Sequence, residues 1–128
     1  METQTIVFSP ISLEWSEWVK WNDIILDARG GAGISIPNYR PGVYEVRLQD
    51  EERRLTIGKA SNLRFRIRQG LVKGKSPHSS GKDIREKEDV SRIVVRWAET
   101  DRPAAVEEHL HMTYLKRFGE PPKYTDHT

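Results

Sequence analysis

Residues 42–58 read GVYEVRLQDEERRLTIG, two apolar runs with a polar turn between them. The first run, residues 42–48, contains two valines and a tyrosine, and β-branched and aromatic residues favour strands. The second run, residues 54–58, has the same character. Two such runs joined by a short polar segment predict an antiparallel β-hairpin.

The residues after the hairpin predict a helix. Ser61 or Asn62 can cap its start, and Gly70 can close it after Gln69. Within this segment apolar residues recur every fourth position and arginines lie between them, which is typical of a helix with one buried face. The residues expected on that face are Leu63, Ile67 and Leu71.

The C-terminal half adds a strand and a long helix. A short helix is expected near 84–87, and the apolar run at 91–98 predicts the central strand of the sheet. Asp101 can cap a helix over 102–118, and Gly119 is suited to end it. Together with the hairpin, these elements predict an α+β domain whose sheet has three antiparallel strands flanked by helices.

The N-terminal third is rich in tryptophan. Its tryptophans recur at a helical spacing and are Trp15, Trp18 and Trp21. This spacing predicts a helix that begins near Leu13 with Ser12 as its cap, followed by a second helical segment at 23–28. We therefore expect residues 1–40 to form a helical extension packed on a core domain over 41–128. The tryptophans either cover one end of the sheet, which we favour, or form an interface for a homodimer or a protein partner.

Composition limits the possible functions. The 128 residues suit one domain, and the absence of cysteine excludes disulfides, thiolate metal sites and a cysteine nucleophile. No run approaches the roughly 18 apolar residues of a membrane helix, and the N-terminus lacks the features of a secretory signal. We therefore expect a cytoplasmic protein with no membrane partner.

The charge is unevenly distributed along the chain. The net charge is only +2, but residues 53–96 hold 13 basic and four acidic side chains, a net of +9. Such a basic segment indicates an anionic partner, of which nucleic acid is the leading candidate, although a solvated basic helix face would give the same count.

Several short motifs follow one another along the sequence in an order and at spacings that match a known protein family. Gly-Val-Tyr at 42–44 is followed by Thr-Ile-Gly at 56–58 and by Lys-Ala-Ser-Asn-Leu-Arg-Phe-Arg at 59–66. This series resembles the signature of the GIY-YIG nuclease superfamily, G-[IV]-Y, then Y-[IV]-G-K-x-x-N-L-x-x-R. The segment Ala-Ala-Val-Glu-Glu-His-Leu at 104–110 is similar to the family's helix with a catalytic glutamate, and Phe-Gly-x-Pro-Pro-Lys-Tyr at 118–124 resembles its closing segment.

The resemblance implies an activity as well as a fold. Members of this superfamily have a three-stranded antiparallel sheet and hydrolyse phosphodiester bonds with one divalent metal ion, Mg²⁺ or Mn²⁺. Carried over to this chain, it makes Glu107 the metal ligand of an endonuclease that cuts DNA by one-step attack of water. A carboxylate on a hard cation suits this chemistry, because the charge of the phosphodiester must be neutralised before water can attack.

The other catalytic candidates also follow from the resemblance. Arg66 would bind the scissile phosphate, and Tyr44 would orient or deprotonate the attacking water. Lys59 would assist that tyrosine or hold phosphate. Thr56 stands where the family has its second tyrosine, and His78 lies in a basic loop that resembles the histidine loop of homing endonucleases.

Further basic residues are candidates for contacts with the nucleic-acid backbone. They are Arg53, Arg54, Arg64, Arg68, Lys73, Lys75 and Lys82. Contacts of this kind give salt-sensitive affinity but little sequence information. The sequence contains no zinc finger or helix-turn-helix, so we expect low sequence specificity.

Two positions depart from the family pattern. Thr56 cannot ionise as a phenol does, and Thr125 stands where the family has an asparagine. These departures motivate an alternative, a catalytically impaired module that binds nucleic acid on the same scaffold. A protein-interaction domain that uses the tryptophans is the third hypothesis.

Overall fold

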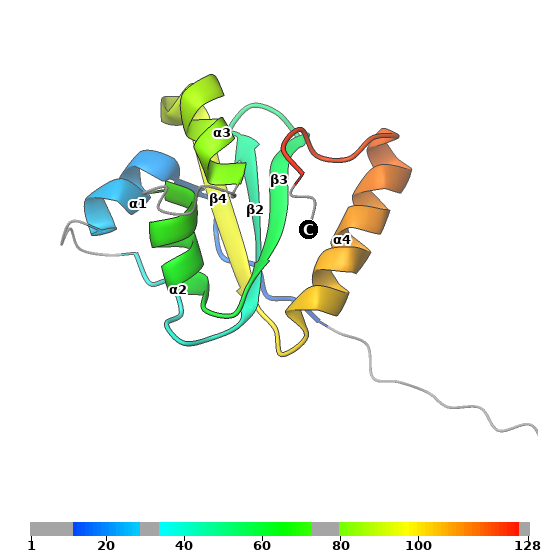
Figure 1. The fold of residues 1–128 in the computed structure, drawn as a ribbon, viewed down its shortest axis with the longest axis horizontal. Coiled ribbons are helices and arrows are strands. Elements are labelled where there is room, and N and C mark those ends of the chain that lie inside the picture. The colour runs from blue at the N-terminus through cyan, green and yellow to red at the C-terminus, as the bar shows by residue number, and fades with distance from the viewer. Residues whose placement is uncertain (1–11, 29–33, 73–79, 126–128) are drawn as a thin grey trace, which may run out of the picture.

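A four-stranded antiparallel sheet lies at the centre of the computed structural model, which describes residues 12–28, 34–72 and 80–125 (Figure 1). The sheet is ordered β1-β4-β2-β3, and helices lie beside it, so the fold is α+β as predicted. Its strands are β1 (Val19–Lys20), β2 (Gly42–Leu48), β3 (Arg54–Ala60) and β4 (Ile93–Glu99).

The predicted hairpin is confirmed by the pairing of β2 with β3. Tyr44 lies opposite Gly58, and Gly42 lies opposite Ala60. The other side of β2 pairs with β4 from Gly42 to Leu48, so β2 is the middle strand of the three long ones. The apolar 91–98 segment was expected to be central, and β4 is indeed an inner strand of the four, with β2 on one side and the short β1 on the other.

The helices cover the two sides of the sheet. They are α1 (Trp21–Ala28), α2 (Leu63–Phe65) with the π-helical η1 (Arg66–Val72), α3 (Ser80–Lys87), the 3₁₀ turn η2 (Val90–Arg92) and α4 (Pro103–Phe118). Figure 1 shows α1, α2 and α3 together on one side and α4 on the other, beside β3. No helix in the described part of the chain combines the length and apolarity needed to cross a membrane.

The main core lies between the sheet and the α1–α3 side. Leu63, Ile67 and Leu71 are buried there, as their spacing predicted, and Ile84 of α3 joins them. Burying each such side chain contributes roughly 1.5–3 kcal/mol. A smaller cluster, Val43, Ala98 and Val106, attaches α4 to the opposite face.

The sheet has four strands rather than the three predicted, because the N-terminal segment is not the expected helix. Residues 12–18 have no regular structure, and the helix predicted from Leu13 is wrong. Ser16 donates its N–H to the Trp97 carbonyl at 2.8 Å, and Trp97 donates its N–H to Ser16 Oγ at 3.0 Å. Val19 then pairs with Val95. The extended segment thus satisfies backbone groups along the outer edge of β4, which would otherwise be an unpaired edge.

The three tryptophans consequently do not share one helix face. Trp21 begins α1 and is buried in the main core, with 1% of its surface exposed. Trp15 and Trp18 precede the helix and lie against arginines: Arg96 is 4.1 Å from the Trp15 ring centroid, and Arg47 is 4.3 Å from that of Trp18. Such stacking on a guanidinium contributes about 0.5–2 kcal/mol.

Two predicted helix ends also need correction. The helix after Asn62, its confirmed N-cap, does not stop at Gly70 but continues to Val72 as η1, since Leu71 and Val72 are buried. Asp101 does not cap α4: Arg102 occupies the cap position and makes no capping hydrogen bond with its side chain. At the other end, Gly119 closes α4 in the left-handed conformation, as predicted.

Candidate active site

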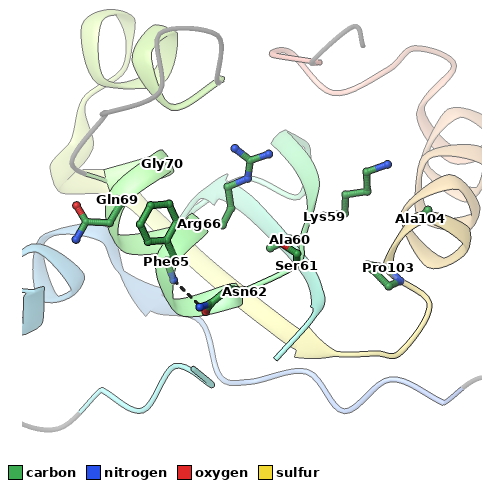
Figure 2. Close-up of a pocket in the computed structure, with 10 residues that line it drawn as sticks. All are labelled: Lys59, Ala60, Ser61, Asn62, Phe65, Arg66, Gln69, Gly70, Pro103 and Ala104. Carbon is green, nitrogen blue, oxygen red and sulfur yellow. Dashed lines mark hydrogen bonds between the residues drawn. The ribbon is translucent and has the colours of Figure 1, made fainter. Parts of the chain in front are cut away.

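A cavity of about 640 Å³ opens where the end of β3, the start of α2 and η1, and the start of α4 meet (Figure 2). Its charged lining residues are Lys59 and Arg66. The rest of the wall combines the amides of Asn62 and Gln69 with apolar residues, among them Phe65 and Ala104. Three segments far apart in the sequence therefore build a single concave surface.

The cavity is electropositive. Lys59 is exposed and Arg66 is half-buried, and Figure 2 shows both side chains extending in the same direction from two sides of the cavity. Neither the Lys59 ammonium group nor the Arg66 guanidinium group forms a hydrogen bond or an ion pair with another described residue. The first residues of α4, Pro103 and Ala104, bring the positive end of a 16-residue helix to the same cavity. These three sources of positive charge favour an anionic ligand.

A glycine makes room for the Arg66 side chain. A Cβ at Gly70, one helical turn later, would lie 3.1 Å from Cδ of Arg66. Such a contact is tight, so the missing side chain leaves the arginine free to lie along η1 towards the cavity. Gly70, predicted as a helix end, is instead part of the arginine's support.

Tyr44 lies underneath the end of β3 rather than in the cavity wall. It is 4% exposed, and its ring packs on Gly58, the residue opposite it in the sheet. A Cβ on Gly58 would lie 2.9 Å from Cε1 of Tyr44 and closer still to Cζ and Oη. The tyrosine of the first motif and the glycine of the second thus form one cross-strand pair, immediately before Lys59.

Glu107 does not line the cavity itself but lies one helical turn from Ala104, which does. One turn further along α4, His111 donates from Nε2 to the Ile57 carbonyl on the outer edge of β3 at 3.1 Å. From His111 back to Glu107 is four residues along the helix, or about 6 Å. From Ile57 on to Lys59 is two residues along the strand, or about 6.6 Å. The half-buried Glu107 is therefore abreast of Lys59, and one turn from Ala104 in the cavity wall.

Thr56 is not in the cavity. It is 2% exposed, and its hydroxyl lies 3.4 Å from that of Ser80, which donates to the Tyr124 carbonyl at 3.1 Å. The hydroxyl thereby links β3 to α3 and the C-terminal segment. Thr125 donates its hydroxyl to the Pro122 carbonyl at 2.8 Å, within a local turn.

Several of the candidate backbone-binding residues are engaged inside the protein. Arg54 donates from Nε to Glu45 at 3.2 Å, and Arg64 donates from Nε to the Ile36 carbonyl at 2.8 Å. Arg53 forms an exposed ion pair with Glu120. All three arginine side chains therefore already have partners within the protein, which the charge count could not show.

Of the remaining candidates, two are on described helices and three are not among the described residues. Lys82 is exposed on α3, and Arg68 is half-buried on η1. His78, Lys73 and Lys75 lie outside the described residues.

The sequence interpretation missed Phe65 and Gln69 as part of the site. Phe65 is 65% exposed at the mouth of the cavity. One signal was available: Phe65 is an aromatic residue on the arginine-bearing side of a helix whose buried positions were already assigned.

The residues present fit a magnesium-type ion. Among the described residues, no three His, Cys, Asp or Glu side chains gather into a ready-made metal cage. A single carboxylate such as Glu107, beside a phosphate-attracting cavity, matches Mg²⁺, which commonly binds one or two carboxylates and keeps several waters.

No family model, curated protein or solved structure matches the chain. The resemblance to the GIY-YIG superfamily therefore rests on the motif residues and their spacing.

Proposed function

We propose that the chain is a GIY-YIG-type endonuclease that uses Mg²⁺ or Mn²⁺ to hydrolyse phosphodiester bonds in DNA, with low intrinsic sequence specificity. One observation carries the proposal. Lys59, Arg66 and the start of α4 line the same cavity. Counting one helical turn back from the contact of His111 with Ile57 puts Glu107 level with Lys59, next to that cavity. The site thus combines a phosphate-binding surface with a carboxylate that suits a divalent cation.

The residues divide the reaction between them. Arg66 and Lys59 bind the non-bridging phosphate oxygens, and their charge reduces the repulsion of an incoming nucleophile. A divalent ion held by Glu107 would supply Lewis acidity at the phosphate. Water attacks phosphorus and loses a proton to solvent while the bond to the leaving oxygen breaks. The leaving oxygen takes up a proton from solvent, so the products are a phosphomonoester and a hydroxyl.

Tyr44 has the water-orienting role in this proposal. Its ring lies against Gly58, directly before Lys59, and since neighbouring strand residues point to opposite faces of the sheet, the phenol and the ammonium group flank the end of β3 from its two faces. Its burial favours orientation through a fixed hydroxyl over action as an open, solvated base.

Cleavage assays with a matched pair of variants test the proposal. Purified protein is incubated with plasmid and with single-stranded DNA in Mg²⁺ or Mn²⁺. Glu107→Gln is expected to lower the cleavage rate by about 100-fold or more, the scale of losing a key charge-stabilising group. Glu108→Gln, on the exposed neighbouring residue of α4, is expected to keep wild-type activity. Equal activity of the two variants, or no cleavage by folded wild type with either metal, would contradict the proposal.

The second candidate function is binding without cleavage. It is favoured by Thr56, whose hydroxyl is taken up by Ser80, and by the burial of Tyr44. A binding module would cut nothing, yet its affinity for DNA would fall with salt. Arg66→Ala would weaken binding and reduce the slope of log K against log salt by about 1. Lys116→Ala, on the exposed face of α4, is the matched control.

A further inference from the structure

Phe65 presents an exposed aromatic ring on a firmly held piece of backbone. Its N–H donates to Asn62 Oδ1 at 3.3 Å, and Asn62 in turn donates to Asn38 Oδ1 at 3.3 Å. On the opposite side of the helix, Leu63 and Ile67 are fully buried. The ring therefore sits on a support that is ordered before any ligand arrives, which lowers the entropy cost of binding.

The surroundings of the ring select a ligand that is both planar and anionic. Phe65 shares the cavity with the cations Lys59 and Arg66. One turn further along, the Gln69 amide also lines the cavity, and it makes no hydrogen bond with any other described residue. An aromatic face, an amide that donates and accepts, and two cations match the base and the phosphate of a nucleotide. A cavity of about 640 Å³ lies within the range of small-ligand sites.

We propose that Phe65 stacks an unpaired base next to the phosphate held by Arg66, so that the substrate is single-stranded or carries an unpaired nucleotide at the cut site. Bases inside an intact duplex are already stacked on each other and cannot cover a protein side chain without being extruded. This inference rests on the proposed function, because it names the class of nucleic acid that the same cavity accepts.

Binding measured without metal tests the inference separately from catalysis. Fluorescence anisotropy in EDTA compares a labelled single-stranded DNA oligonucleotide with the duplex of the same sequence. Phe65→Ala is expected to weaken single-strand binding by about 5- to 150-fold, the effect of losing one base stack, and duplex binding by less than about twofold. Phe65→Trp is expected to restore the affinity, and its fluorescence to be quenched by the single strand.

The control is Leu115→Ala, which removes another exposed apolar side chain, 51% exposed, from the far half of α4. It is expected to change neither affinity. Equal losses for single strand and duplex in Phe65→Ala, or full affinity in Phe65→Leu, would overturn base stacking.

The outcomes also separate this inference from the nuclease proposal. If wild type cuts nothing but Phe65→Ala loses single-strand affinity, the stacking site stands and the nuclease proposal fails. If Glu107-dependent cleavage occurs while Phe65→Ala binds like wild type, only the stacking site fails. If the protein binds no DNA at low salt, both fail.

Discussion

Replacing Gly58 by alanine tests the cross-strand pair that links the two halves of the motif. The new Cβ would lie 2.9 Å from Cε1 of Tyr44 and closer to Cζ and Oη, whereas carbon atoms pack best at about 3.5–4.0 Å. The ring cannot simply swing aside, because Tyr44 is buried on the middle strand with Trp97 opposite it on β4. The strand or the ring must shift.

The expected loss of stability follows from two opposing effects. Overpacking a well-filled core costs about 1–3 kcal/mol, and replacing glycine by alanine in a strand returns about 0.5–1 kcal/mol by restricting the unfolded chain. Taking the middle of each range, we expect Gly58→Ala to be destabilised by about 1–2 kcal/mol. For 128 residues this corresponds to a fall of about 4–8 °C in Tm. In urea, the midpoint should fall while the m-value stays constant.

A double-mutant cycle identifies the cause of that loss. Tyr44→Leu removes the ring, so Gly58→Ala in the Tyr44→Leu background is expected to be neutral or slightly stabilising, with a coupling energy of about 1 kcal/mol or more. Tyr44→Phe keeps Cζ and should keep most of the clash. The same loss of stability in the wild-type and Tyr44→Leu backgrounds would refute the reasoning, as would a stable Gly58→Ala.

Two further predictions concern carboxylates that are paired inside the protein. Glu45→Gln removes the carboxylate charge that accepts a hydrogen bond from Nε of Arg96 at 2.8 Å. It should lower the free energy of unfolding by about 3 kcal/mol, because a partly buried guanidinium is left without its counter-charge. A loss of less than about 1 kcal/mol in a urea titration would contradict this. Burial tends to raise the pKa of Glu88, but hydrogen bonds from Lys123 and Tyr124 outweigh it and hold the pKa below its ordinary value of 4.5. The ionised Glu88 therefore contributes stability above that pH, and this stability is lost as the pH falls through the lowered pKa. In Tyr124→Phe, the Glu88 pKa in a ¹³C carboxyl NMR titration should rise and the fall in stability should begin at higher pH; an unchanged titration would exclude the tyrosine as a cause.

The parts of the fold that the sequence predicted well are those with a local cause. The hairpin depends on two strand-forming runs and a polar turn, all within residues 42–60. The long helix depends on apolar spacing and on Gly119, whose φ of 76° suits glycine. Each signal is complete within a short window of sequence, so no tertiary contact is needed to interpret it.

The N-terminal segment was mispredicted because its structure has a distant cause. A tryptophan every third residue fits a helix as well as any other structure. What selects the extended form is the outer edge of β4, whose backbone groups Ser16 and Val19 satisfy. That edge is some 80 positions away in the sequence, and nothing between Ser12 and Trp21 indicates it.

The candidate site shows the same division. Lys59 and Arg66, which belong to a contiguous motif, do meet in one cavity. The charge count, by contrast, treated all arginines alike, although Arg54 and Arg64 are held by Glu45 and the Ile36 carbonyl. Composition can indicate a basic segment, but partners distant in sequence determine which cations remain available to a ligand.

The position of the cavity follows from how the outer edge of β3 is covered. Tyr124 donates its N–H to the Leu55 carbonyl at 2.7 Å, and His111 donates to the next outward carbonyl, that of Ile57. Both groups hold the C-terminal segment and the middle of α4 close to the strand, so the edge is closed that far.

Beyond Glu107, towards its first residue, α4 carries only small side chains. Pro103 and Ala104 cannot reach across to β3 as His111 does, so the helix and the strand leave a gap at the end of β3, beside Lys59 and Ala60. The gap lies at the start of α4 and beside two cations. The helix that covers most of the β3 edge therefore also leaves, at its first residues, an opening that attracts anions. The cavity at this corner therefore needs no insertion or added loop: it is a consequence of side-chain size along one helix.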